Sequence, residues 1–425
     1  MCGIVGVYDP GPACPVDELT IIAMANEMTH RGPDELSYLV EDGLAFGFRR
    51  LSIVDVLNGH QPFYGVNKDV ILICNGEIYN YKELRFELEK KGYQFKTNCD
   101  VEVVIHLYYE YGTDFISRLN GQFAFAIFDR RNNSLFLARD HFGICPLFYT
   151  NINGVFIFAS EIKAIIKCPL VKREVDLEGL DQIFTFPGLV SPVTLFKNIR
   201  SLPPGSCMVV KNGESTISQY WDLVYPEISE THVEAESYYL EKLDDLLLKS
   251  VRYRLNADVP IGFYLSGGLD SSLIGALMKV VAPEAVFPSF SIGFPFENQM
   301  NEREHQEKMI GHLSLENTAI MFDYAEIEKG LKQAVWASEC SLKESYNTCS
   351  LALSRSVNDQ GIKVILSGEG ADELFGGYVG YRFDKQRTNK TALKDIEEQL
   401  EDDCRRKLWG DPGFFYEKNY YEFTG

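Results

Sequence analysis

The chain has 425 residues, of which 45% are hydrophobic and 24% charged, so it is long enough for two or three globular domains and too apolar for a disordered chain. Its 61 acidic residues outnumber its 41 basic residues, and the net charge of −20 argues against nucleic acid or an anionic membrane as a partner. The ten cysteines form no C-x-x-C pair, and no segment reads as a signal peptide or a membrane span, which together predict a protein of the reducing cytoplasm.

The first half of the sequence is rich in short strand-like runs separated by turn residues. Strands are predicted at residues 4–8, 44–48, 70–74, 123–128, 134–138 and 155–159, and helices over 81–91 and 101–111. Runs of strands with few helices predict an α+β layered domain. A Pro-Pro-Gly turn at 203–205 and a hairpin around Asn212-Gly213 precede a polar stretch. We therefore expect this domain over residues 2–222 and a linker over 223–234.

The second half begins with a predicted helix of about 20 residues that starts near Glu234, and the pattern of predicted elements changes after it. From there, predicted strands at 261–265, 287–292, 318–322 and 363–366 alternate with predicted helices at 271–281, 301–313 and 349–358. This alternation predicts an α/β domain with a doubly wound parallel sheet, which we expect over residues 235–425. The charged segment 394–413 is predicted to be helical at first and then irregular.

The amino-terminal cysteine is the first candidate functional residue. Removal of Met1 would leave Cys2 with a free α-amino group. A thiol with a pKa near 8.5 is mostly protonated at neutral pH, and an α-amino group with a pKa of about 7.7–8.0 can serve as its base. Nucleophile and base would then lie on one residue. By its position alone, however, such a cysteine is more often an incidental second residue.

Four motifs follow Cys2 in order. They are Arg31-Gly32-Pro33-Asp34, Arg50-Leu51-Ser52-Ile53-Val54-Asp55, Asn75-Gly76-Glu77-Ile78-Tyr79-Asn80 and Asp100-x-Glu102. With Met1-Cys2-Gly3-Ile4 this set closely resembles the class II glutamine amidotransferases, whose domain is an αββα amino-terminal nucleophile fold. The resemblance implies that Cys2 attacks the side-chain amide of glutamine and releases ammonia.

The same resemblance assigns the glutamine site. It implies an oxyanion hole made by Asn75 and Gly76, a type of donor worth about 2.7–4 kcal/mol of barrier lowering. It implies that Arg50 binds the substrate α-carboxylate and that Glu77 and Asp100 bind the α-ammonium, with the backbone of Ile53 and Val54 completing the pocket. Taken singly, Asn75-Gly76 is also typical of a hairpin turn, Arg50 of a surface ion pair and Asp100 of a helix N-cap.

A second constellation lies between a predicted strand and a predicted helix: Leu265-Ser266-Gly267-Gly268-Leu269-Asp270-Ser271-Ser272. Glycines admit close approach of a ligand, and hydroxyls with helix N–H groups present donors to an anion. Asp270 suits a site in which Mg²⁺ bridges carboxylate and phosphate oxygens. The loop is not a Walker A motif, and in isolation such a sequence is more often a capped strand-to-helix turn.

A third element, from Ser367 to Tyr378, follows another predicted strand and contains Gly368, Glu369, Asp372 and Glu373. Two strand ends of one parallel sheet would bring this loop and the first one to a common crevice. Together they resemble the loops of the asparagine synthetases and β-lactam synthetases, which have a PP-loop ATP-pyrophosphatase domain. The resemblance implies ATP and Mg²⁺ as cofactors.

This second resemblance also assigns roles. ATP would contact Leu265, Ser266, Gly267, Gly268, Asp270, Ser271, Ser272, Ile292, Ser367 and Gly368, with Asp270 and Asp372 holding Mg²⁺ on the pyrophosphate. Glu369 would lie beside the activated carboxylate as a base or proton relay. Tyr378 would lie near the reacting centre.

The combined interpretation is a glutamine-dependent asparagine synthetase, with glutamine and aspartate as small-molecule partners. Two alternatives stay open: an amide synthetase that acts on another carboxylate, such as a natural-product acid, and a non-catalytic or glutaminase-only relative. The resemblance further implies a helical region with an R-x-P-F-L-D stretch and a lysine after Tyr378. Because this sequence contains no such stretch, we expect the second domain to be incomplete at its carboxyl end. A homodimer is left open.

Overall fold

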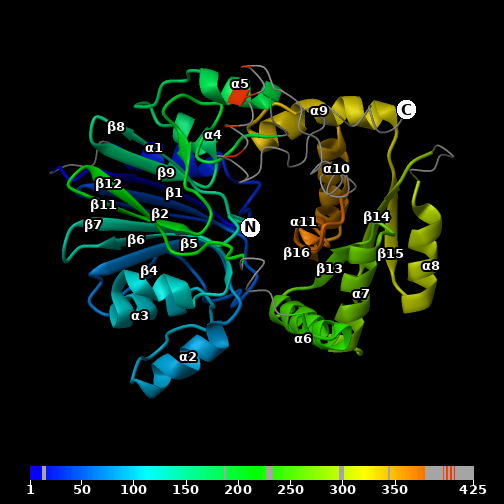
Figure 1. Ribbon diagram of the computed structural model, residues 1–425. Helices are drawn as coiled ribbons and strands as arrows, with labels where there is room; N and C mark the ends of the chain where they lie inside the picture. The colour runs from blue at the N-terminus through cyan, green and yellow to red at the C-terminus, as the bar shows by residue number, and fades with distance from the viewer. Residues whose placement is uncertain are drawn as a thin grey trace.

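The computed structural model describes residues 1–11, 16–185, 188–225, 233–295, 301–342 and 345–378, together with positions 396, 399, 400, 403 and 406. The chain forms an antiparallel β-sandwich with flanking helices, followed by a smaller parallel sheet with its own helices (Figure 1). This arrangement confirms the predicted fold class, an α+β layered first part and an α/β second part.

Two six-stranded antiparallel sheets make up the sandwich. The first has the order β10-β8-β9-β1-β3-β2 and the second β12-β11-β7-β6-β5-β4. The strands of the first sheet are β1 (Gly3–Tyr8), β2 (Glu35–Glu41), β3 (Leu44–Arg50), β8 (Phe148–Ile152), β9 (Val155–Ala159) and β10 (Arg200–Ser201). Those of the second are β4 (Phe63–Tyr64), β5 (Val70–Ile78), β6 (Gly121–Asp129), β7 (Ser134–Arg139), β11 (Ser206–Lys211) and β12 (Glu214–Gln219).

Helices cover the two outer faces of the sandwich and complete four layers. Helices α1 (Glu18–Asn26) and α4 (Ile162–Ile166) pack on the first sheet, and α2 (Tyr81–Lys90) and α3 (Glu102–Tyr111) pack on the second. The remaining helices of this part are the 3₁₀-helix η1 (Gly112–Arg118) and α5 (Leu177–Thr185).

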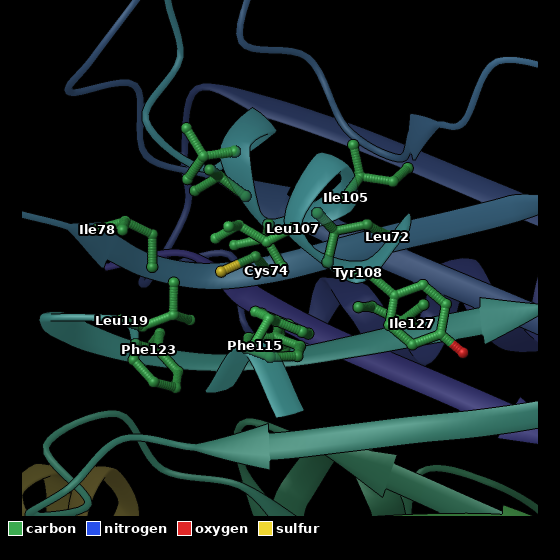
Figure 2. Packing of buried hydrophobic residues seen from close by; sticks show 14 of the residues in the cluster. Leu72, Cys74, Ile78, Ile105, Leu107, Tyr108, Phe115, Leu119, Phe123 and Ile127 are labelled. Carbon is green, nitrogen blue, oxygen red and sulfur yellow. The ribbon is translucent and has the colours of Figure 1, made fainter. Parts of the chain in front are cut away.

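The alternation of side chains along β5 shows how the layers are joined. Ile71 and Ile73 point into the core between the two sheets, whereas Leu72 and Cys74 point to the core under α3. In that second core Leu72 and Cys74 lie next to Leu107 of α3 (Figure 2). Because both faces of β5 are buried, the strand reads as a continuous apolar run in the sequence.

The second part contains four parallel strands in the order β15-β14-β13-β16. They are β13 (Ile261–Tyr264), β14 (Ser289–Gly293), β15 (Asn317–Met321) and β16 (Val364–Leu366). The helices are α6 (Glu236–Arg254), α7 (Leu269–Val281), α8 (Arg303–Leu313), α9 (Tyr324–Ser338), α10 (Tyr346–Asp359) and α11 (Ala371–Phe375). Phe263 and Met278 are fully buried in the core that joins β13 to α7.

Every strand predicted from the sequence is present, but several elements were missed. The sequence analysis did not predict α1, β2, β8, α5 or α9. The charged segment 394–413 lies outside the described residues except at five positions, as does the middle of the expected linker, residues 226–232. None of the helices in the described part of the chain has both the length and the apolar character needed to cross a bilayer.

The packing around Phe125 generates a stability prediction. Phe125 is fully buried, and its ring stacks on Phe115 with centroids 5.9 Å apart. We expect Phe125→Ala to lower the free energy of unfolding of the sandwich by about 3–5 kcal/mol, because the cavity is enclosed by two layers. Phe86 on α2 is 61% exposed, so Phe86→Ala is the matched control and should change stability by about 0.5 kcal/mol or less. Urea denaturation checks both, and equal effects would contradict the assigned core.

Candidate active site

A cavity opens at one end of the sandwich and collects the residues of the first candidate site. Cys2 directly precedes β1, Arg50 ends β3, Asn75 to Glu77 lie near the end of β5, and Asp100 precedes α3. All of these line the cavity, together with Met1, Leu51, Ile53, Val54, Gly59, Gln61, Cys99, Val101 and Gln122. The two packed sheets thus bring Cys2 and Asp100, which are 98 positions apart in the sequence, to one cavity.

Cys2 is held at its backbone and at its sulfur. Its Sγ accepts a hydrogen bond from the Leu51 N–H at 3.3 Å, and its carbonyl accepts one from Arg31 Nε at 2.8 Å. Burial raises the pKa of the Cys2 thiol, while the neighbouring amino terminus opposes that shift. The thiol in this environment therefore needs a base before it can act as a nucleophile.

Asn75 places an unpartnered side-chain amide inside β5, directly before Gly76. The Asn75 side chain is fully buried, and within the described residues neither its Nδ2 nor its Oδ1 has a hydrogen-bond partner. A Cβ atom on Gly76 would lie 2.2 Å from the Gln122 carbonyl oxygen, so only glycine fits against β6. Both residues lie within a strand, and the hairpin-turn alternative for this pair is therefore wrong.

Arg50 is a buried residue with a fixed orientation, so the surface ion-pair alternative is wrong as well. It is 4% exposed, and its guanidinium donates to the carbonyls of Asp55 at 2.7 Å and Val56 at 3.0 Å. Arg50 Nη1 also forms an ion pair with Glu35 Oε2 at 3.7 Å, and this pair is largely buried. A planar cation held from one side in this way can present its remaining donors to a carboxylate in the cavity.

Two carboxyl groups face the same cavity without a strong cation partner. Burial raises the pKa of Glu77 to about 7, and repulsion by Asp100 adds to the effect. Burial also raises the pKa of Asp100 to about 6, against the opposing hydrogen bond from the Ile78 N–H at 2.7 Å. Asp100 does not cap the following helix, whose N-cap is Val101 without a side-chain bond, so that alternative is wrong. An ammonium group would neutralise this acidic pair.

Two residues that the sequence reasoning left without a role complete this site. Asp55 adopts a left-handed backbone conformation with φ 47°, and its carboxylate accepts from the N–H of Asn58 and from the N–H of Asn98. Gln61 exchanges two hydrogen bonds with the backbone of Cys74, which fixes β5 directly before Asn75. Asp55 closes a motif that the sequence analysis quoted, whereas Gln61 carried no sequence signal.

The second candidate site is the loop between β13 and α7. Gly267 has φ 93°, a conformation that favours glycine. The Ser266 N–H donates to Ser271 Oγ at 3.1 Å, and the Gly268 N–H donates to Ser266 Oγ at 3.1 Å. These bonds fold the loop into a cradle at the N-terminus of a 13-residue helix, which is a favourable position for phosphate.

The structure brings the two glycine loops of the second part together. A Cβ on Gly368 would lie 2.8 Å from Asp270 Cβ and 3.0 Å from the Ser271 nitrogen. Gln306 of α8, which the sequence analysis did not single out, donates to the carbonyls of Ser266 at 3.1 Å and Ile292 at 3.0 Å. It therefore ties the ends of β13 and β14 together and helps to shape the crevice at this sheet edge.

The acidic residues of the second loop are more open to solvent. Glu369 and Glu373 are exposed, and Asp270 and Asp372 are half-buried. Tyr378 donates to Glu373 at 2.9 Å, and this hydrogen bond raises the pKa of Tyr378 to about 12. No group of three or more His, Cys, Asp or Glu side chains arranged for a metal is found in the described residues. Two carboxylates with phosphate oxygens and water are nevertheless a donor set that fits Mg²⁺.

The fold and this pair of sites define the class of protein. An αββα sandwich with a cysteine directly before its first strand is joined to a parallel sheet with a glycine-rich strand-to-helix loop. The family model for the glutamine amidotransferase domain matches residues 1–221, and the model for asparagine synthase matches residues 242–421. The chain belongs to the family of glutamine-hydrolysing asparagine synthetases.

Three curated relatives illustrate this membership. Asparagine synthetase [glutamine-hydrolyzing] 1 of Bacillus subtilis is 37% identical over 90% of this chain and 60% of its own length. Asparagine synthetase [glutamine-hydrolyzing] 3 of the same species is 32% identical over 96% of this chain and 69% of its own. Amidase chyE of Penicillium rubens is 32% identical over 84% of this chain and 54% of its own. The chain thus spans between about half and two thirds of the length of these relatives.

The acidic pair predicts how stability depends on pH. The pKa of Glu77 rises from 4.5 to about 7 on folding and that of Asp100 from 3.8 to about 6, so between these limits the folded chain binds more protons than the unfolded chain. The contribution of these two groups to the free energy of unfolding is therefore greatest below about pH 4. It is lost as the pH rises through 6 and 7, and each unit by which a pKa is raised on folding corresponds to about 1.4 kcal/mol.

We expect Glu77→Gln to flatten this dependence and to raise the free energy of unfolding at pH 8, measured by urea denaturation without glutamine. Glu83→Gln on exposed α2 is the control and should leave the profile unchanged. If the pH profiles of the wild type and of Glu77→Gln were the same, Glu77 would not carry the raised pKa.

Proposed function

We propose that this chain hydrolyses glutamine at the first site and uses the ammonia to convert a carboxylate, with aspartate as the leading acceptor, into an amide at the second. The observation that carries the proposal is the unpartnered, fully buried Asn75 amide beside Cys2 in a cavity that also holds Arg50. Family membership supports the same reaction.

The first half-reaction follows from the cavity. Arg50 would bind the α-carboxylate of glutamine, and Glu77 with Asp100 would bind its α-ammonium. Cys2 Sγ would then attack the side-chain carbonyl carbon, and the oxyanion would accept hydrogen bonds from Asn75 Nδ2 and the Gly76 N–H. Collapse forms a thioester, a proton passes to the departing nitrogen to give NH₃, and water releases glutamate.

The base for this step would be the α-amino group of Cys2 after removal of Met1. In the chain that begins with Met1 the Cys2 nitrogen is an amide and cannot accept a proton, and Met1 itself lines the glutamine cavity. The burial that lowers the pKa of the Met1 amino group would act in the same way on an amino group one residue further along. A lowered pKa keeps this amine neutral near pH 7 and available as a base.

The second half-reaction would use the crevice between the two glycine loops. ATP would lie against Leu265, Ile292, Ser367 and Gly368, with its pyrophosphate in the cradle of residues 266–272. An acceptor carboxylate oxygen would attack the α-phosphorus and release pyrophosphate, after which NH₃ displaces AMP. Mg²⁺ between Asp270 and Asp372 would neutralise the phosphate charge, and Glu369 and Tyr378 are proposed to lie beside the reacting carboxylate.

The remaining assignments are proposals of the same kind. We place the glutaminase domain at residues 2–222, the linker at 223–234 and the synthetase domain at 235–425. The free state of the eight cysteines at described positions supports a reducing, cytoplasmic location. Two copies of the chain are proposed to form a homodimer. The similarity to amidase chyE favours a second candidate, in which the acceptor is a carboxylate other than aspartate.

Replacement of the nucleophile separates the two half-reactions. We expect Cys2→Ala to lose glutamine-dependent pyrophosphate release and to keep ammonium-dependent release, because the two substrates use different sites. Cys207→Ala, in a strand outside the cavity, is the control and should retain both activities. Assays with aspartate and then with a panel of other acids identify the acceptor. Loss of both activities in folded Cys2→Ala would contradict two separate sites.

The unpartnered amide of Asn75 makes a second, sharper prediction. Asn75→Leu should lower kcat for glutamine hydrolysis by about 10²–10³, since it removes one oxyanion donor. The same substitution should leave the free energy of unfolding equal or higher, because it removes a buried polar group without a partner. Kinetics and urea denaturation measure the two effects. If activity and stability fell together, Asn75 would be a structural residue.

A further inference from the structure

The loop that carries Arg50, Ile53 and Val54 forms hydrogen bonds to Asp258 in the second part of the chain. The Asp258 N–H donates to the Ile53 carbonyl at 3.0 Å, and Asp258 Oδ2 accepts from the Asp55 N–H at 2.8 Å. This pair of bonds joins residue 258 to both ends of the segment 53–55. The backbone that would complete the glutamine pocket is therefore held from outside its own domain.

Lys363 makes a second contact of the same kind. Its Nζ lies 2.6 Å from Asp34 Oδ2, and the same oxygen accepts the Ser52 N–H at 2.7 Å. The Lys363 and Asp34 side chains are only 30% and 28% exposed, so the pair is partly shielded from water. Asp34 thus connects Lys363 to the start of the loop, as Asp258 connects to its end.

Both contact residues lie where strands of the parallel sheet begin, at the end opposite to the glycine loops. Asp258 comes three residues before β13, and Lys363 directly precedes β16. These strands are parallel neighbours with Ile261 opposite Val364. Their other ends lead into the loops at Ser266 and Ser367, so the four residues of β13 and the three of β16, roughly 10–13 Å of strand, lie between this end of the sheet and the candidate ATP loops.

Asp55 carries the contact onward to the groups that would bind glutamine. Its carbonyl accepts from Arg50 at 2.7 Å, and its carboxylate accepts from the Asn98 N–H at 2.7 Å, two residues before Asp100. Asp55 has φ 47°, in the left-handed region that Asp tolerates better than most residues other than glycine, and these hydrogen bonds help to fix that conformation. Movement at Asp258 would therefore reach Arg50 and Asp100 together.

We propose that Asp258 and Lys363 are positioning residues for glutamine, through which the sheet that carries the ATP loops fixes the geometry of the glutamine-binding loop. The inference rests on the proposed function, since it assigns glutamine to this cavity. Other contacts between the two parts lie elsewhere, for example Tyr253 Oη on Glu83 at 2.9 Å, and they do not touch segment 50–55. They provide matched controls for contact between domains alone.

The experiment uses the full chain with Met1 removed, verified by mass. Asp258→Ala and Lys363→Met are compared with the conservative Asp258→Asn and Lys363→Arg, and with Tyr253→Phe as the control. Three quantities are measured: KM and kcat for glutamate release, the concentration dependence of Cys2 alkylation by 6-diazo-5-oxo-norleucine, and ammonium-dependent pyrophosphate release.

We expect Asp258→Ala to raise KM for glutamine and the half-saturating concentration of the alkylating analogue about ten-fold, as for loss of a hydrogen bond to a charged group, with a smaller change in kcat. Asp258→Asn keeps an acceptor oxygen and should restore most of the affinity. Lys363→Met should act in the same direction, with Lys363→Arg closer to wild type. Ammonium-dependent release should stay within about two-fold, and Tyr253→Phe should change neither activity.

Two results would overturn the inference alone: an unchanged glutamine KM in Asp258→Ala, or an equal fall of glutamine-dependent and ammonium-dependent activity in Asp258→Ala and Asp258→Asn alike. The second would mean that Asp258 serves only the packing of its own domain. If Cys2 of the wild-type chain is not alkylated by the analogue, the proposed function fails first, and the inference fails with it.

Discussion

The first site depends on polar groups that are kept without partners inside a closely packed sandwich. A buried polar group without a hydrogen bond costs about 1–3 kcal/mol, and Asn75 presents both amide atoms in this state. The strand that carries it can bear this cost because β5 pairs with β6 from Val70 opposite Asp129 to Ile78 opposite Gly121. A ligand that offers an oxygen to Asn75 and an ammonium to Glu77 and Asp100 removes a penalty that folding alone leaves in place.

Asp55 supports two of the segments that carry residues of this site. Its carbonyl accepts from the Arg50 guanidinium, and its carboxylate accepts from the Asn98 N–H, two residues before Asp100. The same residue meets Asp258 across the domain contact. Asp55 thus both supports the segments that carry Arg50 and Asp100 and contacts the second domain. The geometry of the pocket therefore depends on the packing of both domains.

The sequence predicted the layers and the motifs but not the contacts between them. Strand β5 was predictable because an apolar run buried on both faces is a strong signal, and Asn75-Gly76 could be located within its motif. Helix α1 was missed because its mean character is apolar on all sides, without the one-sided pattern that identifies a helix. Gln61 and Asp258 each act through a pair of hydrogen bonds, which Gln61 makes over 13 residues of sequence and Asp258 makes over 203 residues to Asp55 and slightly more to Ile53. Such long-range bonds follow from tertiary packing and leave no periodic pattern.

The two candidate sites differ in exposure, and the difference matches the chemistry proposed for each. Cys2 and Asn75 lie in a cavity lined by residues of both sheets, which would shield the proposed thioester and neutral amine from bulk water. Glu369 and Glu373, in contrast, lie on the surface beside the loop of residues 266–272, which hydrogen bonds within the loop hold in shape. A nucleotide is large, and its phosphates bring their own charge and metal, so the cradle needs only shape and donors at the sheet edge. Gln306 supplies that shape, because it holds the carbonyls of Ser266 and Ile292 at the separation set by β13 and β14.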